Sequence, residues 1–450
     1  MPRPSPDRLD FAHLEARGIR FVRVWFVDLG GQVRCEAIRT GHARKLVEEG
    51  VGFVDAVPGL PAFGDVPQVE GGLGPVGQVW LVADPETLRP VPWQEGYAAV
   101  TGSFVSREDE PWRFCARASL ERAVEALREQ GLRLEAAFEA EFTLLERIGD
   151  GDPSWRPVDR SNYASAGAFD ERLPLLDAIV QALEVQELRV ESFLVESGDG
   201  QFEIAIEHAP VLQAADRHAI LRETVKAIAA ESGHRATFLP KIEERQAGSG
   251  AHCHFSLWRD DENVTSLDGD LSPVTRHFLA GVLAHLPALV ALAAPTSQSH
   301  RRLGPGSWSG AFATWGFDNK EAPIRVPTRR HGLPPSNVEW KTPDSTANLH
   351  LALAGLIHAG LDGIRRGLPL PEPCSVDPGS LSDEARTEAG IVSLPGCVDE
   401  ALDTLERDEI LQDGIGRDLL RAHAALRRAD AAATADWSIE SEVRRFSEVW

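Results

Sequence analysis

Cationic side chains are scarce in this 450-residue chain. Lys and Arg together number 46, against 69 Asp and Glu, which gives a formal net charge of −23. A chain with this excess of negative charge repels polyanions and anionic lipid surfaces. The composition therefore disfavours nucleic acid and membranes as partners, and it directs attention to cations and small molecules.

Long uncharged runs are also few. The longest stretch without Asp, Glu, Lys or Arg runs from His277 to His300, and it contains Gly281, Pro287 and Pro295. These breaks favour a buried helix followed by a loop over a membrane span. No basic-then-apolar leader opens the sequence, so we expect no signal peptide.

Cysteine is rare and shows no pairing pattern. The five cysteines, at positions 35, 115, 253, 374 and 397, are odd in number and widely spaced, with no Cys-x-x-Cys. A disulfide framework usually has an even number of cysteines, and a zinc site has closely spaced cysteines. The pattern predicts a reduced, cytoplasmic protein.

The common nucleotide-binding motifs are missing. No P-loop pattern occurs, and Gly72-Leu-Gly74-Pro-Val-Gly77 matches the dinucleotide fingerprint in spacing only. That segment contains a proline and leads into QVWLVA, which reads as a strand where the fingerprint needs a helix. ATP, if it is used, must be held by another kind of site.

What the chain does have is a set of metal-seeking side chains in four short clusters. Glu-x-Glu places two carboxylates on one face of a strand, because strand side chains alternate with a period of two. The second cluster flanks a Ser-Gly-Asp-Gly turn, so its two glutamates can face each other at a hairpin mouth. The six residues are Glu139, Glu141, Glu196, Glu203, His252 and Glu339.

Five carboxylates and one imidazole form a hard, oxygen-rich ligand set. Such a set suits Mg²⁺ or Mn²⁺ better than Zn²⁺. Six ligands exceed what one Mg²⁺ takes from a protein, because this ion keeps several waters. The clusters therefore predict two or more divalent ions that clamp phosphate groups.

Helical spacing of apolar residues predicts several helices. The stretch Gly50–Gly77, rich in Gly and Pro, is expected to form an ordered loop. The charged segment SREDEPW then marks a domain boundary. The expected helices cover residues 42–49, 117–130, 173–183, 215–231, 348–365 and 418–434.

Eight ordered segments together resemble the type I glutamine synthetase family. They are FVRVWFVDLGG, EAEFTL, VESGDGQFEI, ATFLPK, GSGAHCHFSLW, RRLGPGSW, IRVP and VEWKTPDSTAN. Each segment alone is weak, but their shared order over most of the chain is specific. The resemblance implies an α+β fold, with a small β-grasp domain at residues 1–106 and a catalytic domain at 107–450, whose antiparallel strands form a funnel.

The same resemblance implies an ATP-dependent ligase that activates glutamate as γ-glutamyl phosphate. Glu141, Glu196 and Glu203 would then hold the metal near the amino acid. Glu139, His252 and Glu339 would hold the metal shared with the nucleotide. Further residues are implied at ATP and its phosphates (His254, Ser256, Lys320 and Arg325, the last two also offsetting phosphoryl charge) and at the substrate (Gly248, Arg302 and Lys341).

Several positions depart from the family pattern on the amine side. Trp308 stands where the family's flap has a glutamate that closes the site around ammonium. In the segment GFVDAVPG, Asp55 is displaced by one residue from the family's ammonium-binding aspartate, and no serines follow it. Ala247 replaces a usual asparagine, and Lys320 and Lys341 replace arginines. These departures favour an organic amine or polyamine as substrate, with Trp308 and Asp55 at the amine site.

Two alternatives remain open from the sequence. One is an ordinary glutamine synthetase that uses ammonia, and the other is a non-catalytic assembly protein on the same fold. In every case the resemblance implies a ring-shaped homo-oligomer, such as a dodecamer. Regulation by adenylylation of a C-terminal tyrosine is not expected, because Tyr97 and Tyr163 are the two tyrosines of the chain.

Overall fold

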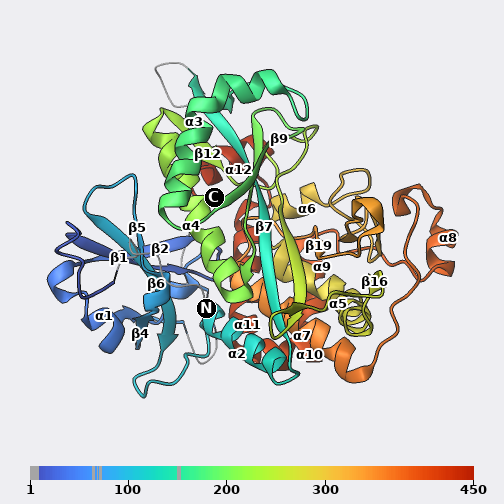
Figure 1. The fold of residues 1–450 in the computed structure, drawn as a ribbon, viewed down its shortest axis with the longest axis horizontal. Helices are drawn as coiled ribbons and strands as arrows, with labels where there is room; N and C mark the ends of the chain where they lie inside the picture. The colour runs from blue at the N-terminus through green and yellow to red at the C-terminus, as the bar shows by residue number, and fades with distance from the viewer. Residues whose placement is uncertain (1–9, 63–65, 68, 70–72, 149–153) are drawn as a thin grey trace.

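The computed structural model describes residues 10–62, 66–67, 69, 73–148 and 154–450. A small sheet built from the N-terminal residues lies at one side of the molecule (Figure 1, blue). A larger sheet, which includes one long strand, forms the centre, and helices surround it (Figure 1). This mixed α+β architecture confirms the fold class predicted from the sequence.

The helices of the described residues are α1 (Lys45–Glu48), α2 (Ala116–Arg128), α3 (Ala166–Val185), α4 (Val211–Glu231), α5 (Pro273–Ala293), α6 (Ser297–Arg302), α7 (Leu349–Arg366), α8 (Asp383–Glu388), α9 (Val398–Arg407), α10 (Glu409–Ile415), α11 (Arg417–Thr434) and α12 (Ile439–Phe446). Short 3-10 turns occur at η1 (Thr40–His42), η2 (Val57–Gly59), η3 (Pro85–Thr87), η4 (Arg330–Gly332) and η5 (Pro378–Ser380). All six helices expected from apolar spacing are present, with ends shifted by a few residues in most cases. The first is split into η1 and α1.

The strands are β1 (Phe21–Val27), β2 (Val33–Arg39), β3 (Val51–Val54), β4 (Gln78–Ala83), β5 (Arg89–Pro90), β6 (Tyr97–Val105), β7 (Arg133–Ile148), β8 (Ser154–Pro157), β9 (Val190–Val195), β10 (Gln201–Ile206), β11 (Ala209–Pro210), β12 (His234–Thr237), β13 (Ala251–Arg259), β14 (Glu262–Asn263), β15 (Ser266–Leu267), β16 (Asp270–Leu271), β17 (Trp315–Phe317), β18 (Ile324–Val326) and β19 (Val338–Trp340).

The N-terminal sheet has the strand order β2-β1-β6-β4-β3, with β5 added beside β6. β1 pairs with β6 in parallel and with β2 in an antiparallel hairpin. Gly50–Gly77 was expected to be a loop, and this is wrong at its start. Val51–Val54 forms β3, which pairs with β4, because alternating Val and Phe side chains fit a half-buried strand. Residues 63–65, 68 and 70–72 of that stretch lie outside the described residues.

The larger sheet is organised around β7, a strand of 16 residues. Its main order is β17-β18-β19-β13-β7-β10-β9, and β8, β11 and β12 also pair with β7. Along β7 the side chains of Phe138, Ala140 and Phe142 are fully buried in the core. Glu139 and Glu141 alternate with them and therefore point to the opposite face of the sheet.

Helices α5 and α7 pack closely beside this sheet. A Cβ atom at Gly281 would lie 2.1 Å from the carbonyl oxygen of Ala359, and one at Gly363 would lie 2.0 Å from the carbonyl oxygen of His277. Glycine at both positions lets the two helix backbones touch. α5 is the one helix in the described part of the chain long and apolar enough to cross a membrane, and 67% of its most apolar window is buried. It is a core helix, as its glycine and prolines predicted.

Candidate active site

Strand register brings four of the six metal-seeking side chains together. Glu139 on β7 lies opposite His252 on β13, and Glu141 lies opposite Glu203 on β10. Directly opposed residues of an antiparallel pair have their side chains within contact distance on one face. The neighbouring strand β19 contributes Glu339. The period-two pattern of each cluster therefore converges on one face of the sheet.

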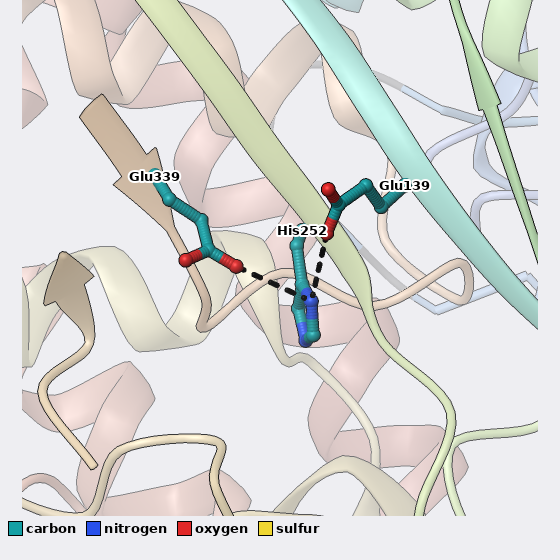
Figure 2. A group of neighbouring side chains, drawn as sticks. All are labelled: Glu139, His252 and Glu339. Carbon is teal, nitrogen blue, oxygen red and sulfur yellow. Dashed lines mark ion pairs between the residues drawn. The ribbon is translucent and has the colours of Figure 1, made fainter. Parts of the chain in front are cut away.

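Two compact groups of ligand atoms result. Glu139, His252 and Glu339 form one group, and Glu141, Glu203 and His252 form the other, with the ligand atoms of each group within 4.8 Å of one another. His252 Nδ1 lies 3.7 Å from Glu139 Oε2 and 3.5 Å from Glu339 Oε1 (Figure 2). Figure 2 shows the imidazole between the two carboxylates, each of which comes from a different strand. Carboxylates around an imidazole fit a hard divalent cation.

A cavity of about 640 Å³ opens over these groups. Its volume falls in the range of small-molecule sites. Of the residues singled out from the sequence, its lining includes Glu139, Glu141, Glu196, Glu203, Gly248, His252, Arg302, Trp308, Lys320, Arg325, Glu339 and Lys341. Glu196 lines the cavity but is not a member of the two compact groups.

The acidic side of the cavity is electrostatically uncompensated. Burial, together with the negative charges of Glu139 and Glu141, raises the pKa of Glu203 to about 9. Burial and the charge of Glu141 raise the pKa of Glu196 to about 7. Crowded carboxylates in a low-dielectric site keep protons because they repel one another when ionised. A bound cation would release those protons, so the electrostatics fit the metal that the donor set suggests.

The opposite side of the cluster is held by cations. Arg325 Nη1 lies 2.6 Å from Glu339 Oε2, and Lys341 Nζ lies 3.2 Å from Glu339 Oε1. Burial would raise the pKa of Glu339, but the charges of Lys341 and His252 hold it at about 2. Burial would likewise raise the pKa of Glu139, but its interactions with His252 and His254 lower it. This end of the cluster is therefore ionised and ready to bind a cation.

Arg302 is buried at the floor of the cavity. Its guanidinium donates hydrogen bonds to the backbone carbonyl oxygens of Thr342, Pro343 and Lys341. Its Nε has no partner among the described residues. The guanidinium is thereby oriented by the loop that follows β19, which leaves Nε as an unused donor.

Gly248 leaves space for the Arg302 side chain. A Cβ at Gly248 would lie 2.5 Å from Arg302 Cγ and 2.6 Å from the Pro240 carbonyl oxygen. The absence of a Cβ at this glycine lets the Arg302 side chain pack against its backbone within the cavity. The role at the substrate that the resemblance implies for Gly248 stays a prediction.

Two of the expected nucleotide residues lie beside the cavity, outside its lining. His254 Nε2 is 3.1 Å from Glu139 Oε1, and His254 Nδ1 lies 2.9 Å from Asn337 Oδ1. Ser256 is buried further along the same face of β13, where its hydroxyl accepts a hydrogen bond from Trp258 Nε1. Among the described residues, neither lines the cavity, and both lie further along the face of β13 that carries His252. Their expected role at ATP stays a prediction.

Asp55 lies apart from the cavity of its own chain. It follows β3 in the N-terminal domain, and its carboxylate accepts a hydrogen bond from the amide of Gly74. Among the described residues it is not part of the cavity lining. Its expected role at an amine site stays a prediction that requires a neighbouring subunit.

Sequence reasoning missed several residues of the site. Gln201 Nε2 donates to the Gly248 carbonyl oxygen and to the Ser249 hydroxyl, which fixes the glycine loop. It lies two residues before Glu203 on the same face of β10, so the period of two could have revealed it. Tyr163 also lines the cavity, but it comes from an irregular segment that carries no periodic signal.

A sheet that carries two carboxylate–histidine groups on one face, with cationic side chains beside them, is typical of enzymes that use divalent metal ions to handle phosphate groups. The family model for the glutamine synthetase catalytic domain matches residues 113–446. The chain belongs to the glutamine synthetase family. It is a glutamine synthetase-like carbon–nitrogen ligase that uses ATP and glutamate.

Curated relatives of two kinds are similar over nearly the whole chain. Type-1 glutamine synthetase 1 of Dictyostelium discoideum is 33% identical over 459 aligned positions, covering 96% of this chain and 90% of the relative. Gamma-glutamylpolyamine synthetase GlnA3 of Streptomyces coelicolor is 32% identical over 427 positions, covering 93% of this chain and 91% of the relative. Because the two identities are nearly equal, they do not decide between ammonia and an amine.

Solved structures show the same fold. A novel glutamine synthase homolog matches with a TM-score of 0.84 at 31% identity and covers all of both chains. GmaS in complex with ADP matches with a TM-score of 0.82 at 26% identity, covering 96% of this chain and 98% of that one.

Proposed function

We propose that this ligase joins the γ-carboxylate of glutamate to an organic amine or polyamine in preference to ammonia. The observation that carries the proposal is the position of Trp308. Its side chain is 55% exposed and lines the same cavity as the acidic cluster. The resemblance places a glutamate at this position of the family's flap.

The nature of the amine follows from what Trp308 offers. Ammonium is small and charged, and its capture needs carboxylates that attract the cation and take its proton. An indole supplies neither function, but it offers a broad apolar wall and a π face for an alkyl or aromatic amine. Asp55, the other expected ammonium residue, does not line the cavity of its own chain.

Two divalent ions, Mg²⁺ or Mn²⁺, fit the two compact groups of ligand atoms. Glu141, Glu203 and the nearby Glu196 would hold one ion, and Glu139 and Glu339 the other, with His252 within reach of both groups. Such ions offset the negative charge that develops on a transferred phosphoryl group. Glu203 and Glu196, whose pKa values are raised, would lose their buried protons as an ion binds there.

The cations of the cavity would divide the remaining work. Arg325 and Lys320 would offset phosphoryl charge, and their support is that Arg325 pairs with Glu339 and that both side chains line the cavity. Arg302 and Lys341 would receive the carboxylate groups of glutamate. A planar guanidinium that is already held by three backbone carbonyls gives a carboxylate a fixed direction of approach.

ATP would extend along the face of β13 that carries His252. His254, Ser256 and Trp258 follow His252 at steps of two residues and therefore share that face. The ring of His208 stacks on Trp258, with centroids 6.1 Å apart. This aromatic pair provides a flat surface at the far end of the row for a nucleobase, while the phosphates lie at the metal groups.

We also propose that the enzyme works in the cytoplasm as a ring-shaped homo-oligomer, such as a dodecamer. The resemblance supports this assembly, and Asp55 would then reach the active site of a neighbouring subunit. An active monomer by light scattering would contradict it.

The function is tested by a coupled ATPase screen of glutamate with a panel of amines, ammonia included. We expect an organic amine to give the highest kcat/KM. Trp308→Ala should raise KM for that amine about tenfold and leave KM for ATP within about twofold, because it removes binding at one subsite only. Trp155→Ala, on β8 and outside the cavity lining, is the matched control. Ammonia as the best nucleophile, with Trp308→Ala harmless, would overturn the proposal.

A further inference from the structure

We propose that Glu321 is a positioning residue that sets amine selectivity by clamping the loop that carries Trp308. This inference rests on the proposed function and concerns a residue that the sequence did not single out. Glu321 lies between β17 and β18, directly after Lys320. Its carboxylate lies beneath the loop Gly304–Trp308, which follows α6 and stands at the rim of the cavity.

The loop has a conformation that needs support from outside. Trp308 has a φ of +55°, in the left-handed region that a bulky side chain seldom adopts. Gly306 and Gly310 also have positive φ, of +73° and +85°. Most of the segment is exposed to solvent. A strained, solvent-exposed loop persists in one conformation only when other contacts hold it there.

Glu321 supplies those contacts with both of its oxygens. Oε2 accepts a hydrogen bond from the amide of Gly306 at 3.1 Å, and Oε1 accepts one from the amide of Trp308 at 3.0 Å. Among the described residues, both hydrogen bonds that tie the backbone of this exposed loop to another part of the chain end on Glu321. Hydrogen bonds to an ionised carboxylate are the stronger kind.

Lys320 also contacts Trp308, through the indole side chain; together with the two Glu321 hydrogen bonds, this contact forms what is called the clamp. Its ammonium lies 4.9 Å from the centroid of the Trp308 ring, within the range of a cation–π contact. Two consecutive residues thus hold one tryptophan, Lys320 by its ring and Glu321 by its backbone. The turn that carries them is itself fixed, because Asn319 Nδ2 donates to the carbonyl oxygens of Cys374 and Val376.

The consequence for selectivity follows from this geometry. The clamp fixes the indole at the cavity rim with one face occupied by Lys320. An amine therefore meets the remaining apolar surface of the indole, in a pocket whose width the clamp sets. If the loop is released, Trp308 moves and the amine subsite loses its shape, while the metal groups and the nucleotide face remain intact.

Glu321→Gln is the decisive variant. Glutamine keeps the size but has one acceptor oxygen, so its NH₂ group faces a backbone amide where the second hydrogen bond was. Hydrogen exchange followed by mass spectrometry should show faster exchange in residues 303–310 of this variant. KM for the preferred amine should rise about tenfold with KM for ATP nearly unchanged. Glu388→Gln, an exposed glutamate on α8, serves as the matched control and should change neither.

The double variant Trp308→Ala/Glu321→Gln separates positioning from a direct role. If Glu321 acts through Trp308, adding Glu321→Gln to Trp308→Ala should leave KM for the amine where Trp308→Ala alone puts it. Unchanged exchange of the loop, an unchanged KM for the amine, or an additive effect in the double variant would each overturn the inference. Ammonia as the best substrate would overturn the proposed function instead, and the exchange experiment would still decide whether the clamp exists.

Discussion

Two clusters of buried acidic residues in the described part of the chain have opposite surroundings. Asp216 on α4 is fully enclosed near the contact between the small sheet and the catalytic domain. Arg117 Nη2 lies 3.0 Å from Asp216 Oδ2, and His350 Nε2 lies 2.8 Å from Asp216 Oδ1. Arg117 also pairs with Asp84 of the N-terminal domain at 2.8 Å. Every strong charge at this place has a partner from the same chain.

Around Glu196 and Glu203, the active site repeats the burial but not the compensation. Burial would raise the pKa of Asp216, but Arg117 and His350 lower it below its usual range. Burial and the neighbouring carboxylates raise the pKa of Glu203 to about 9. The difference distinguishes a structural charge cluster from a functional one. The charge of Asp216 is compensated by side chains of the same protein, whereas ionised Glu203 would need a bound cation.

The same chemical change at the two places should have opposite effects on stability. Asp216→Asn removes one partner of a buried pair and should lower the free energy of unfolding by about 3 kcal/mol. Glu203→Gln mimics the neutral acid and should raise that free energy by about 1–3 kcal/mol at pH 8 without metal, because wild-type Glu203 must take up a proton on folding at this pH and glutamine needs none. Urea unfolding of both variants beside the wild type, in EDTA, measures the two values.

Equal destabilisation by both variants would break the comparison. It would mean that the acidic cluster is also balanced by the chain itself. Glu388→Gln on the surface of α8 controls for the loss of charge alone and should change stability by less than about 0.5 kcal/mol.

Activity should follow the active-site cluster alone. Glu141→Ala or His252→Ala should lower activity by at least about tenfold, because each group of ligand atoms serves the whole phosphoryl transfer. Added EDTA should abolish activity, and Mg²⁺ or Mn²⁺ should restore it. Full turnover in EDTA, measured as ADP release, would remove the metal from the reaction.

Much of the fold could be predicted because periodicity records it directly. Leu349–Arg366 and Arg417–Thr434 are helices with an apolar stripe, and their ends fell within a few residues of the prediction. Val51–Val54 was missed because glycines and prolines around it masked a four-residue strand. Short strands take their stability from pairing partners distant in sequence, here β4, and no local pattern reports that pairing.

In the candidate site, too, residues with a local periodic pattern could be predicted and residues that depend on distant contacts could not. Glu139 and Glu141 follow strand periodicity, so their shared face could be inferred before the structure, whereas His252 lies on another strand and was assigned from the family resemblance. Glu321 could not, because its role depends on a loop 13 residues away whose backbone amides point toward it. The composition of that loop does not indicate that its amides donate hydrogen bonds to a carboxylate elsewhere in the chain. Long-range hydrogen bonds to backbone groups leave no periodic trace in a sequence.

The uncompensated cluster should also make stability depend on pH. Glu196 and Glu203 have pKa values of about 7 and about 9 in the folded chain, both raised by burial and by neighbouring carboxylates. The folded state then binds more protons than the unfolded state above pH 4.5, so stability falls as pH rises through these values. The slope is at most about 1.4 kcal/mol per pH unit for each proton. Melting in EDTA from pH 6 to pH 9 measures it, and saturating Mg²⁺ should flatten the curve.

The smallest effect concerns His285 on α5, which lies between two acids in a third buried cluster. Its Nδ1 is 2.6 Å from Asp408 Oδ2 and its Nε2 is 3.2 Å from Asp362 Oδ2, while Arg366 Nη1 donates to Asp362. Burial would lower the pKa of His285, but the two carboxylates raise it above 6.5. A raised pKa in the folded state stabilises the protein below pH 6.5, and this contribution is lost as pH rises through the folded value.

His285→Gln should therefore destabilise the protein by about 1 kcal/mol at pH 6 and by less at pH 9, because the glutamine keeps a hydrogen bond but not the charge. Deprotonation of Glu196 and Glu203 also lowers the stability of the protein as pH rises. Mg²⁺ distinguishes this cause from the titration of His285. Saturating Mg²⁺ should leave the difference in Tm between wild type and His285→Gln unchanged at each pH, since the cluster binds no ion. A difference that disappears when Mg²⁺ is added would show that His285 responds to the active site, and the separation of self-compensated from cation-dependent acids would then fail.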